Sequence, residues 1–124
     1  MNEVTPAELL GQLREDIELI AARPADQEAW LIEHRYPVDE IALQLDDSVF
    51  CFLPRLRREG LMPAELEAAV RQLDDHFDSF SGRENAARWT EEALSSDPVW
   101  GEARRQAQAI LGLMDAMTTD AADR

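Results

Sequence analysis

The sequence contains no lysine: all 12 of its basic residues are arginine, and 26 acidic residues stand against them. The formal net charge is -14. Because proteins bind nucleic acid largely by neutralising phosphates, this charge disfavours direct nucleic-acid binding. It disfavours an anionic membrane surface for the same reason. A surface with this negative field suits a cationic protein partner instead.

Cysteine is almost absent as well. The single Cys51 excludes an internal disulfide, and the first residues lack the basic and then apolar pattern of a secretory signal. We therefore expect a cytoplasmic protein. Cys51 lies in the apolar run 49–53, so we expect it to be a buried core residue rather than a nucleophile. No apolar run approaches the roughly 20 residues of a transmembrane helix, and we expect no membrane span.

Motifs typical of catalytic, phosphate-binding and metal-binding sites are also missing. The five glycines are scattered, and neither a phosphate-binding loop nor a Gly-x-Ser-x-Gly elbow is present. His34 and His76 lack the spacing of zinc ligands within one helix, and Asp46–Asp47 lacks the pattern of a calcium loop. We therefore expect no enzymatic activity, no cofactor and no metal.

What the sequence does contain is helical periodicity. A chain of 124 residues that is 45% hydrophobic suits one folded domain, and its apolar residues recur at intervals of three and four. The pattern predicts an all-α fold, a single compact domain of five or six bundle-like helices over residues 1–117, followed by a frayed C-terminal tail, 118–124. Caps and prolines place the helices at about 5–23, 26–36, 38–58, 63–80, 84–94 and 97–117.

The segment 38–58 is apolar on nearly every side. Ile41, Leu45 and Leu56 share one face, while Leu43 and Phe50 lie on the opposite face. Such a helix is central in its domain or presses one face on a partner. Its part 48–53 could form a strand instead, but no second segment shows the alternation of a pairing strand. The proline at position 54 should kink this helix.

Carboxylates concentrate on two of the predicted helices, without arginine between positions 35 and 55. Together with nearby aromatic residues they form a candidate partner-binding face, because aromatic anchors beside charges are typical of interfaces. The alternative is that these charges are ordinary solvated helix positions. The candidate residues are Asp39, Glu40, Asp46, Asp47, Glu67, Asp74, Asp75, Asp78, Trp30, Tyr36 and Phe50. Trp89 and Trp100 fall at helical core positions and are expected to pack inside.

Three segments in the C-terminal third carry a family resemblance. Residues 89–94 (Trp-Thr-Glu-Glu-Ala-Leu), 97–100 (Asp-Pro-Val-Trp) and 104–111 resemble the closing helices of small acidic bacterial immunity proteins, which accompany secreted toxins. The resemblance implies a cytoplasmic inhibitor that binds a cognate toxin domain and blocks its active site or substrate groove. It implies no catalytic residue and transfers no contact position.

Two hypotheses follow from the sequence. The first is a non-enzymatic, acidic helical binding protein that neutralises or sequesters a cationic protein partner, such as a toxin domain. The alternative is a self-associating module, a homodimer that buries the apolar third helix while its acidity serves solubility. The oligomeric state separates the two, because the second requires a dimer.

Overall fold

The computed structural model describes the backbone of residues 4–122 and the side chains of residues 4–117. This part of the chain contains helices and no strand, which confirms the all-α prediction and excludes the alternative strand at 48–53. The elements are α1 (Pro6–Ala21), α2 (Pro24–His34), α3 (Glu40–Arg58), α4 (Ala64–Asp78), the 3₁₀ helix η1 (Arg83–Arg88), α5 (Glu91–Ser96) and α6 (Pro98–Ala122).

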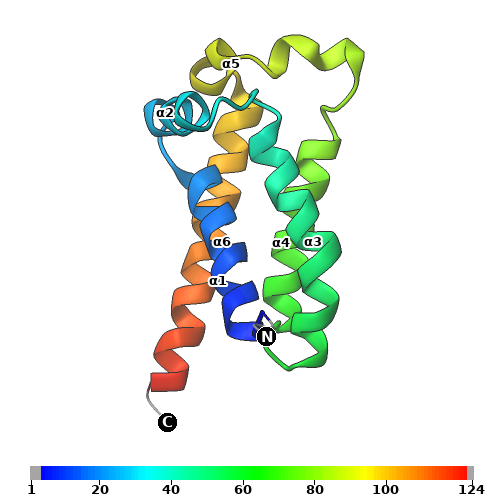
Figure 1. Ribbon diagram of the computed structural model, residues 1–124, viewed down its shortest axis with the longest axis vertical. Helices are drawn as coiled ribbons and strands as arrows, with labels where there is room; N and C mark the ends of the chain where they lie inside the picture. Colours follow the sequence, from blue (N-terminus) through cyan, green and yellow to red (C-terminus); the bar gives the residue numbers. More distant parts are fainter. Residues whose placement is uncertain (1–3, 123–124) are drawn as a thin grey trace.

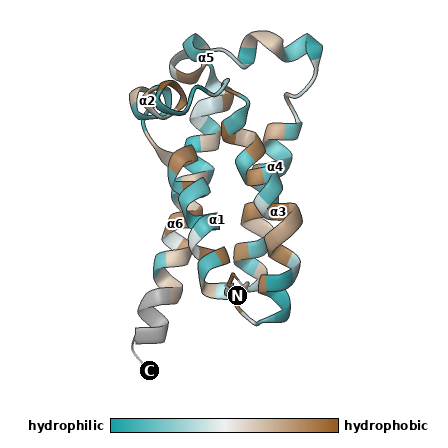
Figure 2. Cartoon of the chain, in the orientation of Figure 1, coloured by the Kyte–Doolittle hydropathy of each residue, from teal (hydrophilic) through white to brown (hydrophobic). Residues whose placement is uncertain are grey.

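Four long helices form the body of the molecule (Figure 1). Helix α1 packs against α3 and α6, and α4 packs against α6 and α3, so the four helices surround one core. The shorter elements α2, η1 and α5 lie at one end of this bundle. Teal and brown residues alternate along the long helices in Figure 2, as expected for amphipathic helices that bury one face. The outer sides of α3 and α4 form one flank of the bundle.

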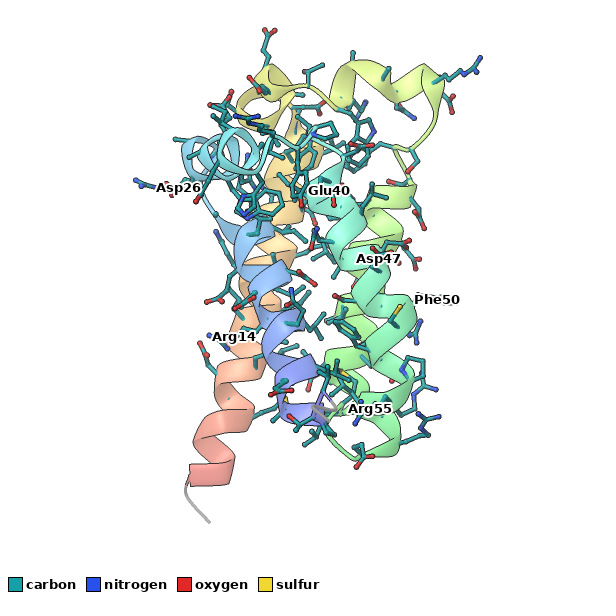
Figure 3. All side chains as sticks on the ribbon, in the orientation of Figure 1. Arg14, Asp26, Glu40, Asp47, Phe50 and Arg55 are labelled. Carbon is teal, nitrogen blue, oxygen red and sulfur yellow. The ribbon has the colours of Figure 1, made fainter. Side chains whose placement is uncertain are left out.

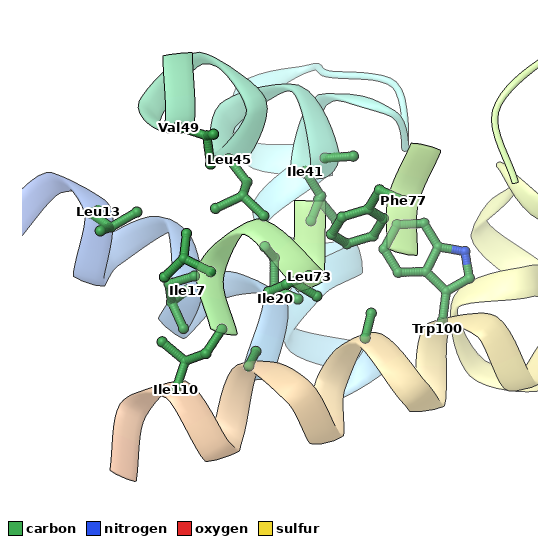
Figure 4. Close-up of a cluster of buried hydrophobic side chains, with 14 of the residues drawn as sticks. Leu13, Ile17, Ile20, Ile41, Leu45, Val49, Leu73, Phe77, Trp100 and Ile110 are labelled. Atoms are coloured by element: carbon green, nitrogen blue, oxygen red, sulfur yellow. The ribbon is translucent and has the colours of Figure 1, made fainter. Parts of the chain in front are cut away.

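Side chains from all four long helices meet in the core (Figure 4). Periodic apolar positions on each helix supply them, which is how the stripes predicted from the sequence become a common interior. The labelled members are Leu13, Ile17, Ile20, Ile41, Leu45, Val49, Leu73, Phe77, Trp100 and Ile110, and all of them are buried.

Helix α1 starts as the sequence predicts, with a capping box. The backbone N–H of Glu8 donates to Thr5 Oγ1 at 3.1 Å, and the backbone N–H of Thr5 donates to Glu8 Oε2 at 2.9 Å. Two of the donors that a helix start leaves free are thereby satisfied. Helix α2 differs: it begins at Pro24, and Asp26 forms an ion pair with Arg23 at 3.1 Å instead of capping the helix.

The predicted helix at 84–94 is wrong. A 3₁₀ turn, η1, ends at Arg88, and α5 begins only at Glu91, where Thr90 Oγ1 accepts from the backbone N–H of Ala93 at 3.2 Å. Trp89 lies between them with a non-helical backbone, and its indole donates to the carbonyl of Phe80 at 2.8 Å. This hydrogen bond near the end of α4 outweighs the helical tendency that the periodicity of the segment indicates. It places Trp89 beside α4.

The structure contradicts two further predictions. Cys51 is exposed rather than buried, because α3 turns its neighbours Val49 and Leu53 to the core. The last helix continues to Ala122 instead of ending at Met117, so the predicted tail is helical up to that residue, and positions 123–124 lie outside the described residues. Helix α3 is continuous through Pro54, and the kink expected there stays a prediction.

A buried polar contact joins α1 to α3. Ser48 donates its hydroxyl to Asp16 Oδ2, and Gln12 Nε2 donates to Asp16 Oδ1 at 3.3 Å. Asp16 is only 5% exposed, and burial raises the pKa of its carboxyl to about 6. A carboxylate in the middle of this interface is therefore costly when ionised, and the two hydrogen bonds offset part of that cost.

Candidate binding groove

Helix α3 has two different faces in the folded protein. Its inner face is buried against α1 and α4, whereas Leu43 is 47% exposed and Phe50 is 82% exposed on the outer face. Figure 3 shows Phe50 on the side of α3 that lies away from α1. A single exposed apolar residue is ordinary. An exposed phenylalanine and leucine on one face of a helix, however, mark a surface whose burial against a partner would be favourable.

A cleft of about 490 Å³ opens between the first turns of α3, the last turn of α4 and η1. Its apolar wall includes Val38, Ala42, Leu43, Phe77 and Trp89, and Pro37 and Gly82 also line it. Four carboxylates also line the cleft: Asp39, Asp46, Asp74 and Asp78. An apolar wall with a few convergent charges is typical of a binding site.

A second hollow, of about 590 Å³, continues along the same two helices. Its lining residues are Asp46, Asp47, Val49, Phe50, Pro54, Arg71 and Asp74. The two hollows share Asp46 and Asp74, so they adjoin each other along α3 and α4. We call the two together the α3–α4 groove.

The groove carboxylates are electrostatically uncompensated. Among the described side chains, none of Asp39, Asp46, Asp47, Asp74 and Asp78 forms an ion pair. Arg71 lines the second hollow, but its guanidinium donates to Glu67 at 2.9 Å instead. Negative charge therefore accumulates where two helices meet, and a cation that entered the groove would relieve it.

Asp74 shows the effect of this accumulation. Its carboxyl is half-buried at the junction of the two hollows, and burial together with the charges of Asp46 and Asp78 raises its pKa to about 7. A hydrogen bond with the carboxyl of Asp46 contributes in the same direction, because one of the two groups must hold a proton to donate it. At neutral pH the Asp74 carboxyl is therefore only partly ionised, because its neighbours oppose a further negative charge in the groove.

The structure brings six of the predicted partner-binding residues to the groove, and they come from both α3 and α4. These are Asp39, Asp46, Asp47, Phe50, Asp74 and Asp78. Leu43 and Trp89 also line it, although neither is among the predicted partner-binding residues. The signal for Leu43 was its position opposite the buried stripe of α3, whereas Trp89 was assigned to the core.

The other predicted residues lie elsewhere or are already engaged. Glu67 accepts from both Arg57 and Arg71, which lowers the pKa of its carboxyl to about 2. Glu40 accepts from Gln44 at 2.9 Å, and Asp75 is exposed on α4 without lining the groove. These three carboxylates are therefore poorer candidates for a partner contact.

Trp30 and Tyr36 form a separate aromatic cluster near the end of α2. The ring of His34 lies 4.7 Å from the ring of Trp30 and 5.6 Å from that of Tyr36, centre to centre. Tyr36 is 41% exposed and directly precedes Pro37, which lines the groove. The cluster therefore lies close to the groove along the chain but takes no part in lining it.

No group of three or more histidine, cysteine, aspartate or glutamate residues that could hold a metal ion occurs within the described part of the chain. Over the same residues, no helix is both long and apolar enough to cross a membrane. The comparisons with known proteins found no matching family model, no matching curated protein and no matching solved structure.

The two raised carboxyl pKa values predict that acidification stabilises the fold. A folded state that holds protons on Asp16 and Asp74 more tightly than the unfolded chain loses stability as pH rises from about 4 through their pKa values of about 6 and 7. Glu67 acts oppositely, but only as pH falls below its ordinary 4.5. The thermal midpoint should be about 5 °C or more higher at pH 5.5 than at pH 8.

Differential scanning calorimetry over this pH range measures the effect, with Asp74→Asn as the comparison. The variant should be more stable than the wild type at pH 8. Its thermal midpoint should differ much less between pH 5.5 and pH 8 than that of the wild type. A thermal midpoint that stays constant or rises from pH 5.5 to pH 8 would show that the groove carboxylates are not crowded.

Proposed function

We propose that this protein is a non-enzymatic binding protein that holds a cationic protein partner on the α3–α4 groove and thereby neutralises or sequesters it. The observation that carries the proposal is the combination of uncompensated carboxylates with an apolar wall in one depression. Neither part alone would suffice, because charges alone are common on a solvated surface and apolar walls alone do not select a charge.

The physics favours a protein partner with arginine or lysine on its surface. Charge-assisted hydrogen bonds from these side chains would neutralise the groove carboxylates, and they gain strength where Asp74 is half-buried. Burial of Phe50 and Leu43 would add hydrophobic free energy at about 25 cal/mol per Å² of apolar surface. The long-range negative field would also accelerate the encounter.

The resemblance of residues 89–111 to immunity proteins suggests which cationic partner to test. We propose a toxin domain whose own substrate is anionic, because its active site would have to be positively charged to hold that substrate. A row of carboxylates in a groove would imitate phosphates and block the site. In this proposal the protein acts in the cytoplasm of the cell that makes it, with no cofactor and no chemistry of its own.

The homodimer remains the alternative, and the exposure of Leu43 and Phe50 is the observation that favours it. A second copy, however, would bring its own charge of -14 to the interface. Like charges that face each other cost free energy unless cations intervene. We therefore expect a monomer by size-exclusion chromatography with light scattering, and a stable dimer would reverse the order of the two hypotheses.

Phe50 and Phe52 provide a matched pair that tests the proposed function. Phe50→Ala should change the free energy of unfolding by less than about 0.5 kcal/mol, because the side chain is exposed. Phe52→Ala should cost about 1 to 3 kcal/mol, because that side chain is partly buried against the core. Binding should respond in the opposite order, with Phe50→Ala weakening it at least about tenfold.

Urea unfolding measures the stabilities, and surface plasmon resonance measures binding to basic protein domains encoded beside this chain's gene. If Phe50→Ala destabilises the protein as much as Phe52→Ala does, the outer face of α3 is already covered in solution. If neither variant changes binding to a domain that the wild type binds, the groove is not the contact surface.

A further inference from the structure

We infer that the element of the partner that occupies the α3–α4 groove is a cationic amphipathic α-helix of about four turns. This inference rests on the proposed function and specifies what the groove accommodates. It follows from the spacing of the outer residues of α3, from the length of the groove and from the placement of its charges.

The outer face of α3 has the spacing with which helices recognise helices. Leu43, Asp47, Phe50 and Pro54 follow one another at intervals of four, three and four residues, and none of them is buried. This interval pattern forms a single stripe along one side of a helix. Helix α3 thus carries a second stripe besides its buried one, and no element of the described chain covers it.

The groove has the dimensions of a helix-binding site. Its lining residues on α3 extend from Ala42 to Pro54, which corresponds to about 18 Å at 1.5 Å per residue, and the turn at Val38 and Asp39 lengthens it beyond the start of the helix. Helices α3 and α4 pack side by side, and the depression between two neighbouring helices is where the ridges of a third one fit. A helix of about 16 residues would span this length.

The charges select a cationic helix rather than another copy of this chain. Carboxylates from α3 and α4 line the groove together, Asp46 and Asp47 from one helix, Asp74 and Asp78 from the other. A helix with apolar residues directed at Leu43 and Phe50 would place arginine or lysine on its flanks against them. A copy of this chain would bring its net charge of -14 to the same place.

The cleft at the η1 end provides the most specific contact in this arrangement. Phe77 and Trp89 form part of its apolar wall, and Asp74 and Asp78 lie along the same cleft. An arginine at the end of the bound helix could stack on an aromatic ring while its guanidinium bonds a carboxylate. The second hollow offers a less specific contact, with Val49, Phe50 and Pro54 as its apolar lining residues.

Two synthetic peptides test the inference. The first is a helix of about 16 residues with leucine at every third or fourth position and arginine on both flanks. The second has the same composition in an order that destroys the apolar face. Isothermal titration calorimetry compares their binding to the wild type, to Phe50→Ala and to the triple variant Asp46→Asn/Asp74→Asn/Asp78→Asn. A matched control, Glu33→Gln/Glu91→Gln/Glu92→Gln, removes as much charge outside the groove.

We expect the amphipathic peptide to bind with one-to-one stoichiometry and at least about tenfold more tightly than its isomer. Phe50→Ala and the groove triple variant should each weaken it at least about tenfold, whereas the control triple variant should weaken it less than about threefold. The isomer should hardly respond to Phe50→Ala, because it has no apolar face to place there.

Other results would overturn the inference in distinguishable ways. Equal binding of both peptides would exclude a helix in the groove but leave the proposed cationic partner standing. No binding of either peptide would overturn both proposals. Light scattering that shows a dimer of the free protein, dissociated by Phe50→Ala, would assign the groove to a second copy and overturn the cationic helix.

Discussion

Replacing Trp100 with alanine should lower the free energy of unfolding by about 3 to 5 kcal/mol, measured by urea titration. Its indole is fully buried, with ring centres 5.5 Å from those of Phe77 and Trp89. The indole N–H donates to the carbonyl of Arg88 at 2.7 Å, which ties η1 to the start of α6. The substitution would create a cavity and leave this carbonyl without its partner.

Trp100→Phe separates the two contributions, because phenylalanine retains most of the buried ring but cannot donate. We expect it to cost less than half as much as alanine. Trp100→Phe should also loosen the η1 wall of the groove, since Trp89 packs against Trp100. A cost below about 1 kcal/mol for Trp100→Ala would contradict the packing described for this end of the bundle.

Neutralising Asp46, Asp74 and Asp78 together to asparagine should have opposite effects on partner binding and on stability. Binding should weaken about a hundredfold at low salt, because three groove carboxyl groups that a bound cation would hold in the ionised form disappear. The thermal midpoint at pH 8 should rise, because burial of the Asp74 carboxylate and its repulsion by the other two no longer oppose folding. Residues retained at a cost to stability are expected at functional sites.

Salt dependence provides the internal control for this variant. The difference in association rate between wild type and variant should shrink as the Debye length falls from about 10 Å at 0.1 M salt to 3 Å at 1 M. The Glu33, Glu91 and Glu92 triple variant should retain most of the binding and gain no stability. If both triple variants weaken binding equally, only the overall field matters and the groove is not a defined contact surface.

The fold was predictable because its signals are local. The capping box at Thr5 and Glu8 and the apolar stripe of α4 depend on residues three or four positions apart, which a single chain displays directly. The break at Trp89 was not predictable in this way. It depends on an indole that reaches the carbonyl of Phe80, a contact between elements that helical periodicity does not describe.

The groove was predictable only in part. The sequence places Asp74 on a candidate partner-binding face of its helix, where a solvated charge would contribute little to folding. The structure places it half-buried between α3 and α4, where Asp46 and Asp78 raise the pKa of its carboxyl. Which carboxylates come close together depends on how the two helices pack. Glu67 is the opposite case, because its carboxylate forms ion pairs with Arg57 and Arg71.

Titration of the Asp74 side-chain carboxyl by carbon-13 NMR, in the free protein and with the amphipathic cationic peptide bound, tests the central claim most directly. In the free protein the carboxyl should titrate near pH 7, because burial and the neighbouring carboxylates disfavour its ionised form. With the peptide bound, a cation in the α3–α4 groove should lower that midpoint by two pH units or more, to about 5 or below. A midpoint near the ordinary 3.8 in the free protein, or one that the bound peptide leaves unchanged, would contradict the account.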